Sequence, residues 1–335
     1  MSAMAPTATA TGSLGKWESL AAEWRDRVSP ATVVRCEEPL GPKTTLRVGG
    51  AARVYAEPAG LADLQSLLRS AGTSGVAVFP LGRGSNLIVP DEGVDGLVVS
   101  LAHEVWSSCE VREGGRIWAG AGLRLKHLCG VAAKAGLAGF EFLEGIPGSV
   151  GGALRMNAGA MGGWIFDVVE EALVISLDGE LATRSRASLR AGYRACQDLE
   201  DAIALGALLR APSGAAAREP GAPAPGIEAI ARQTDVYRRK RQESQPKEPS
   251  AGCIFKNPPG MAAGRLIDEC GLKGRRIGGA EVSPVHANFI INRGGATGGE
   301  VLELIRQVRA RVREVKGVEL QPEAILYGRQ WEDVW

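Results

Sequence analysis

Several features that define other protein classes are scarce in this chain of 335 residues. Aromatic residues make up only 5% of it, and no apolar run approaches the roughly 20 residues that a membrane-spanning helix needs. The formal net charge of +1 argues against a wide basic surface for nucleic acid, although a local anion site stays possible. We therefore expect a cytoplasmic protein that contacts neither a membrane nor nucleic acid.

Paired cysteines are also missing. The six cysteines form no Cys-x-x-Cys pair, and no histidine spacing indicates zinc, so we expect scattered reduced thiols and no metal. The first residues, MSAMAPTATATGSLG, lack the charged and apolar segments of a signal peptide. We predict a disordered tail over residues 1–20.

Apolar periodicity predicts strands and helices along most of the chain. We expect strands at 53–57, 76–80, 96–101, 167–177 and 202–210, and helices at 61–68, 124–136, 227–244 and 301–315. Gly136 and Gly317 are placed to end two of these helices, and Val301, Ile305, Val308, Val312 and Val315 predict one buried helix face. Between them, residues 211–226 are rich in Ala, Pro and Gly and predict a linker or exposed loop.

Glycine is abundant, and a first glycine loop, LGRGSNLIV (81–89), follows a predicted strand. Gly82 and Gly84 leave room for successive N–H groups to face one anion, and Ser85 and Asn86 add polar contacts. The third glycine of a Rossmann fingerprint is absent, and a strand follows instead of a helix. A phosphate site and a tight structural turn explain this loop equally well.

A second glycine-dense stretch, GIPGSVGGALRMNAGAMGG, occupies residues 145–163. So many glycines weaken any helix or strand, which leaves two interpretations. One is a turn between packed layers, and the other is backbone lying against a large flat ligand and its diphosphate. Two separate glycine loops without a Rossmann or Walker pattern favour a nucleotide cofactor bound in an unusual way.

A few polar residues are candidates for chemistry. Arg194 follows Tyr193 in GYRACQ and could hold a carboxylate at two points, although an exposed arginine beside a packed tyrosine is the commoner case. Glu323 follows a proline in an apolar, strand-like run, where partial burial would raise its pKa. His286 is either a core histidine or a ligand contact, and Cys253, in PSAGCIFKNP, has the apolar neighbours of a buried thiol.

Read together, these stretches resemble the UDP-N-acetylenolpyruvoylglucosamine reductase family. The resemblance runs in order through several motifs and covers about residues 33–328. The motifs are TTLRVGGAA (44–52), LGRGSNLIV, GLAGFEFLEGIPGSVGGALRMNAGAMGG (136–163), GYRA, QPKEPSAGCIFKNP (245–258), AGRLIDECGLKGRRIGGAEVSPVHANFIIN (263–292) and GVELQPEAILYG (317–328). Several long motifs in the right order are far more specific than a lone glycine loop.

The resemblance implies an α+β protein with a two-subdomain FAD-binding domain of the vanillyl-alcohol-oxidase type and a C-terminal α+β substrate-binding domain. We expect FAD-binding subdomains at 21–101 and 102–212, a linker at 213–226, the substrate-binding domain at 227–328 and a tail at 329–335. The short interval between GYRA and PSAG, filled with Ala and Pro, indicates the branch of the family with the shorter substrate loop.

The family's site residues transfer onto matching positions as expectations. Those implied to bind FAD, noncovalently, are Arg47, Gly82, Arg83, Gly84, Ser85, Asn86, Gly145, Ile146, Pro147, Gly148, Ser149, Gly152, Asn157 and Gly159. Those implied to bind substrate are Tyr193, Arg241, Asn257 and His286, with Arg241 near the diphosphate of UDP. The implied catalytic residues are Arg194, Cys253 and Glu323.

The activity implied is reduction of UDP-N-acetylglucosamine enolpyruvate to UDP-N-acetylmuramate by NADPH through FAD. The reaction implied is a step of peptidoglycan synthesis, so the resemblance also implies a role in cell shape, cell division and the cell cycle. We expect the protein to be a monomer. Cys253 stands where most relatives have the serine that protonates the substrate, and a thiol is the stronger acid. If the site lowered its pKa, activity would fall at high pH. Another oxidoreductase on the same fold, and a nucleotide-sugar-binding protein without redox function, are the alternatives.

Overall fold

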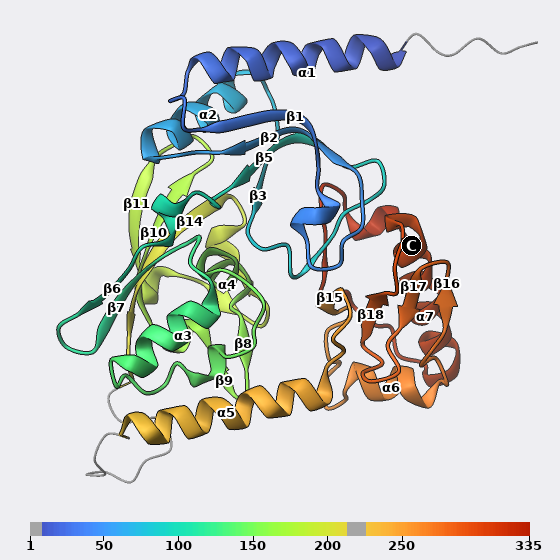
Figure 1. Cartoon of the computed structure of the whole chain (residues 1–335). Helices are drawn as coiled ribbons and strands as arrows, with labels where there is room; N and C mark the ends of the chain where they lie inside the picture. The colour runs from blue at the N-terminus through green and yellow to red at the C-terminus, as the bar shows by residue number, and fades with distance from the viewer. Residues whose placement is uncertain (1–8, 213–225) are drawn as a thin grey trace, which may run out of the picture.

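The computed structural model describes residues 9–212 and 226–335, which form three larger sheets and three sheets of two strands each (Figure 1). The first sheet has the order β1-β2-β5-β3, in which β1 is antiparallel to β2 and the other pairs are parallel. Its strands are β1 (Val33–Pro39), β2 (Ala51–Glu57), β5 (Val94–Ser100) and β3 (Val78–Leu81). Helices α1 (Thr9–Asp26) and α2 (Leu61–Thr73) cover it and share its apolar core.

Helix α1 overturns part of the predicted disordered tail. The chain is helical from Thr9, and Trp17, Ala21 and Trp24 are buried in the core of the first sheet. These residues recur at i, i+4 and i+7, the spacing of one helix face. The prediction was therefore wrong for this stretch, whereas residues 1–8 lie outside the described residues.

The second sheet is antiparallel, with the order β11-β10-β14-β7-β6. Its strands are β11 (Leu181–Ser185), β10 (Val169–Ser176), β14 (Ala202–Arg210), β7 (Arg116–Gly120) and β6 (Cys109–Arg112). Helices α3 (Leu125–Lys134) and α4 (Val150–Met156) pack on it. Two small hairpins, β8 (Gly159–Ala160) with β9 (Gly163–Trp164) and β12 (Ala191–Gly192) with β13 (Ala195–Cys196), project from this unit.

The third sheet is antiparallel in the order β15-β18-β17-β16 and packs with helices α6 and α7. Its elements are β15 (Ser250–Cys253), α6 (Ala263–Glu269), β16 (Arg276–Ile277), β17 (Ala280–Val282), β18 (Phe289–Asn292) and α7 (Gly298–Lys316). The predicted valine face of α7 is buried except at Val315, which is exposed in the last turn before Gly317 ends the helix. The prediction was wrong there because the core does not reach that turn.

Two connections tie the units together. Helix α5 (Ile227–Ser244) packs against α3 and the 3₁₀ helix Glu141–Leu143 and then leads to β15, so it lies with the second sheet although we assigned it to the substrate-binding domain. Strand β19 (Ile325–Leu326) pairs in parallel with β4 (Leu87–Ile88). Of the predicted linker at 213–226, residues 213–225 lie outside the described residues, and Gly226 immediately precedes α5. Within the described ranges, no helix is long and apolar enough to cross a membrane.

Candidate active site

A cavity of about 2060 Å³ is lined by residues of all three units. This volume is about twice the upper end of the range of roughly 300–1,000 Å³ that is typical of small-molecule sites. Its walls include both glycine loops, the β12–β13 turn and the strand ends around Cys253 and Glu323. Such a volume accommodates a dinucleotide and a second ligand together.

The first glycine loop lies against the segment that precedes β2. Gly84 has a φ of +60°, and a side chain there would place its Cβ 2.7 Å from the Cα of Thr44. The N–H of Thr45 donates to the carbonyl of Gly84 at 3.3 Å. The glycine is therefore needed for close backbone approach, and the loop, with Gly82, Arg83 and Ser85, faces the cavity.

The second loop contributes its backbone to the same cavity through Gly145, Ile146, Pro147, Gly148, Ser149, Gly152 and Gly159. Gly145 has a φ of +73°, and a Cβ there would lie 2.8 Å from Cδ of Arg241. Other glycines of this stretch serve packing, since a Cβ on Gly151 would meet Ala121 at 2.9 Å and one on Gly163 would meet Phe142. Packing therefore explains some glycines of this stretch, whereas contact of the others with a ligand stays a prediction.

Four arginines on the cavity wall have no ion-pair partner among the described residues: Arg47, Arg83, Arg124 and Arg241. Burial, and then the nearby charge of Arg124, lowers the pKa of Arg83. Burial likewise lowers the pKa of Arg241, whose Nε is buried without a hydrogen-bond partner. Unpaired cations beside two glycine-rich loops fit a diphosphate, the group that FAD would bring. Sequence reasoning missed Arg124, which immediately precedes α3.

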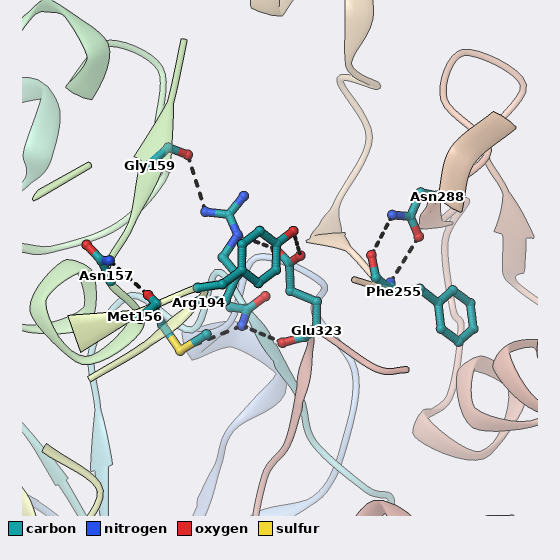
Figure 2. A network of polar contacts seen from close by, with 10 residues as sticks. Met156, Asn157, Gly159, Arg194, Phe255, Asn288 and Glu323 are labelled. Carbon is teal, nitrogen blue, oxygen red and sulfur yellow. Dashed lines mark hydrogen bonds and ion pairs between the residues drawn. The ribbon is translucent and has the colours of Figure 1, made fainter. Parts of the chain in front are cut away.

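Arg194 and Glu323 meet inside the cavity although 129 positions separate them in the sequence. The Nε of Arg194 lies 2.8 Å from Oε1 of Glu323, whose side chain is only 9% exposed. A second guanidinium nitrogen donates to the carbonyl of Gly159, as Figure 2 shows. The hydroxyl of Tyr193 lies 3.4 Å from Oε2 of the same carboxylate. The guanidinium is thus held in one place by two elements.

The backbone of Arg194 is itself unusual. It forms the second residue of the two-residue turn between β12 and β13 and has a φ of +55°. A residue with a side chain adopts this left-handed conformation at a cost of about 1–2 kcal/mol. The ring of Trp164, which sequence reasoning missed, lies 5.5 Å from the guanidinium carbon and adds a cation–π contact. This backbone strain indicates that the fold holds the Arg194 side chain in a specific place.

Cys253 ends β15 and lines the cavity beside Glu323. Burial and the charge of Glu323 raise the pKa of the thiol to about 11, against the opposing effects of Arg194 and Arg241. Burial also raises the pKa of Glu323. The condition for an alkaline loss of activity, a lowered thiol pKa, is therefore not met. The site holds a protonated thiol beside two cations that favour its conjugate base.

Not every residue expected at the site faces the cavity. Asn157 is buried, ends α4 in a left-handed conformation and donates from Nδ2 to the carbonyl of Gly192 at 2.9 Å. His286 accepts from the N–H of Asn288 through Nδ1, and Asn257 accepts from the N–H of Ala263. The bonds of His286 and Asn257 are local, whereas that of Asn157 joins the end of α4 to the β12–β13 hairpin. Tyr193 borders the site through its hydroxyl.

The basic residues 238–241 differ in their surroundings. Arg238 pairs with the buried Glu144 at 2.9 Å and with Asp235 at 2.7 Å. Arg239 is exposed, whereas Arg241 lines the cavity. Only Arg241 of these arginines is placed to meet a ligand there. No group of three or more possible metal-ligating side chains occurs in the described part of the chain.

Comparison with known proteins agrees with this arrangement. The C-terminal domain model of UDP-N-acetylenolpyruvoylglucosamine reductase matches residues 245–327, and the FAD binding domain model matches residues 52–185. The reductase of Geobacter metallireducens is 42% identical over 295 residues, which cover 88% of this chain and 94% of the relative. That of Pelobacter propionicus is also 42% identical, over 294 residues, covering 88% and 95%.

A solved structure gives the same result at the level of the fold. The crystal structure of UDP-N-acetylenolpyruvylglucosamine reductase from Thermus caldophilus superimposes with a TM-score of 0.74 at 37% identity, covering 88% of this chain and 99% of that one. The α+β architecture, with an FAD-binding domain followed by the family's C-terminal domain, is thereby confirmed. The chain is a member of the UDP-N-acetylenolpyruvoylglucosamine reductase family.

Proposed function

We propose that this FAD-dependent oxidoreductase reduces the enolpyruvyl ether of UDP-N-acetylglucosamine enolpyruvate to the lactyl ether of UDP-N-acetylmuramate, with NADPH as the reductant. The observation that carries the proposal is the meeting of Arg194, Glu323 and Cys253 on the wall of a glycine-lined cavity. An anion-binding group, a carboxyl group and a proton donor are the groups that this reduction requires.

FAD, held noncovalently by the two glycine loops and by Arg47, Arg83 and Arg124, would supply the hydride that the vinyl CH2 carbon receives. The exposed backbone and unpaired guanidinium groups of the cavity support this assignment. The protein's part is to orient the double bond and to stabilise the charge that develops on the adjacent carbon and its carboxylate.

Arg194 would bind the substrate carboxylate, where negative charge increases in the transition state. Its geometry suits this role because Glu323, Gly159 and Trp164 hold the guanidinium before substrate arrives. A group already in place loses little freedom during reaction. Glu323 would keep Arg194 aligned and stabilise or protonate the intermediate, directly or through water.

Cys253 would donate its proton to the carbon next to the carboxylate after hydride reaches the CH2 carbon. The C–H bond forms as the S–H bond breaks, and the resulting thiolate lies near Arg194 and Arg241, both of which lower the pKa of the thiol. A thiol with a pKa of about 11 is a weaker acid than a free cysteine but still a far stronger one than a serine hydroxyl.

Arg241 would bind the diphosphate of UDP, because it lines the cavity without an ion-pair partner and its buried Nε has no hydrogen-bond partner among the described residues. Tyr193 would border the substrate, and NADPH would use the same cavity before the enolpyruvate enters. For Asn257 and His286 the local bonds described above favour a supporting role over direct contact. The resemblance to the family is the ground for proposing a cytoplasmic monomer.

An anaerobic visible spectrum of the purified protein tests the proposal. We expect a flavin band that bleaches with NADPH and returns when UDP-N-acetylglucosamine enolpyruvate is added. A flavin band that bleaches with NADPH but does not return with the enolpyruvate would refute the substrate assignment. A protein that binds no FAD would refute the cofactor assignment.

A further inference from the structure

A buried asparagine outside the cavity wall is bonded to the segment that carries Cys253. Asn288 is 2% exposed and immediately precedes β18. Its Oδ1 accepts from the N–H of Phe255 at 3.0 Å, and its Nδ2 donates to the carbonyl of the same residue at 2.8 Å. Figure 2 shows the two bonds side by side. One side-chain amide thus takes both main-chain groups of a residue two positions from the thiol.

The Asn288 side chain makes the hydrogen bonds that the main chain of a neighbouring strand would otherwise make. The pairing of β15 with β18 is irregular between Ser250 and Cys253, where the register shifts. Gly252, within that shift, has a φ of +79°. Beyond the shift, the hydrogen-bond ladder between β15 and β18 does not include Phe255. Its buried main-chain N–H and carbonyl groups therefore need other partners. The amide of Asn288 supplies both.

The same segment also fixes Glu323. The carbonyl of Ile254 accepts from the N–H of Glu323 at 2.7 Å, and the N–H of Ile254 donates to the main-chain carbonyl of Asn288 at 2.9 Å. Residues 253–255 therefore lie between the start of β18 and the segment before β19 that carries Glu323. A shift of this segment would move the thiol and the carboxylate relative to each other.

We propose that Asn288 is a positioning residue that holds the Cys253 thiol and the Glu323 carboxylate in their working arrangement. The role in proton transfer rests on the proposed function, whereas the positioning of the thiol does not. Asn288 acts through the backbone of residues 254–255 and through a side-chain hydrogen bond to the Cys253 thiol, and it touches neither the reacting carbon nor the cofactor. The consequence is that loss of this amide loosens Cys253 specifically.

The test compares Asn288→Leu with Asn292→Leu in the FAD-loaded protein. Asn292 is the other buried asparagine of this strand region, and its amide donates to the carbonyl of Leu46 at 3.1 Å, away from Cys253. The rate of alkylation of Cys253 by iodoacetamide is followed by peptide mass spectrometry and divided by the rate of Cys270 in the same sample. Thermal unfolding reports the stability that each variant loses.

We expect the relative alkylation of Cys253 to rise roughly ten- to hundred-fold in Asn288→Leu, because two buried hydrogen bonds restrain the segment. In Asn292→Leu it should stay within about two-fold at a similar loss of stability. Equal alkylation in the two variants would overturn the proposal. If the relative alkylation of Cys253 rises as expected but the unaltered protein does not reduce the enolpyruvate, the positioning role stands and only the proposed function is refuted.

A measurement on the unaltered protein covers the case in which Asn288→Leu does not fold. Amide hydrogen exchange of residues 253–256 should be as slow as that of β18, because Ile254 and Phe255 both donate to Asn288. The milder variant Asn288→Ser should accelerate exchange in this segment and leave β10 unchanged. Fast exchange of the segment in the unaltered protein would refute the restraint.

Discussion

Raising the pH from 7 to 10 tests the state of Cys253 directly. Burial and Glu323 raise the pKa of its thiol from an ordinary 9.0 to about 11. The thiol donates its proton only when protonated, so activity that depends on it is lost as the pH rises through the folded-state value. At pH 9 an ordinary thiol with a pKa of 9 is about half ionised, whereas one with a pKa of 11 is only about 1% ionised.

The assay is stopped-flow reoxidation of the reduced flavin by the enolpyruvate substrate, because this half-reaction contains the proton donation. We expect its rate to lose less than about a factor of two between pH 7 and 10 on account of Cys253. Cys253→Ser supplies the matched control, since a serine does not ionise in this range. A loss centred at pH 8–9 in the native protein and absent from the serine variant would refute the raised pKa.

Replacement of the thiol completes this prediction. Cys253→Ala should slow flavin reoxidation by roughly 10²–10⁴-fold, the usual contribution of a positioned general acid, and leave flavin reduction by NADPH unchanged. Cys253→Ser should retain measurable reoxidation. An alanine variant with full activity would show that another group or water supplies the proton.

Three further substitutions follow from the geometry. Arg194→Lys should slow flavin reoxidation by roughly 10²-fold and leave flavin content unchanged, because a lysine cannot hold a carboxylate at two points; an unchanged rate would contradict the assigned role. Gly145→Ala should lower thermal stability by about 1–3 kcal/mol and more than Gly75→Ala, which has a similar positive φ but no atom within 4 Å of its new Cβ. Arg241→Met should raise the KM for the UDP substrate roughly ten-fold or more, whereas the exposed Arg239→Met should leave it unchanged. Equal effects of the two arginine variants would remove Arg241 from the substrate site.

Local patterns predicted helices α2, α3, α5 and α7 and strands β2, β3, β5, β10 and β14. The valine spacing predicted α7, and the glycines at its end and after α3 predicted where those helices stop, because these signals act within a few residues. The same kind of signal, Trp17 with Ala21 and Trp24, was present in α1. It was missed because the composition of the preceding residues dominated the interpretation.

The site could be predicted only in part, and the reason is distance along the chain. The glycine loops and the candidates Arg194, Glu323 and Cys253 stood out in the residues, and the resemblance implied their roles, whereas the partner of each side chain depends on folding. Asn288 bonds to Phe255, 33 positions away, and a buried amide before an apolar strand has no pattern that sets it apart. His286 and Asn257 matched substrate positions, yet each accepts a bond from a main-chain N–H only a few positions further along the chain, because the local turn brings that group to the side chain.

The pairing of β19 with β4 has a consequence for how the protein is made. Ile325 lies beside Leu87, so the strand next to the first glycine loop gains its partner only after a long further stretch of chain has been synthesised. Contacts so far apart in the sequence close late, because the loop entropy must be overcome before they form. Both glycine loops are synthesised long before Cys253 and Glu323 join them. A nascent chain should therefore be able to fold its first two sheets, and to recruit FAD, before it can catalyse anything.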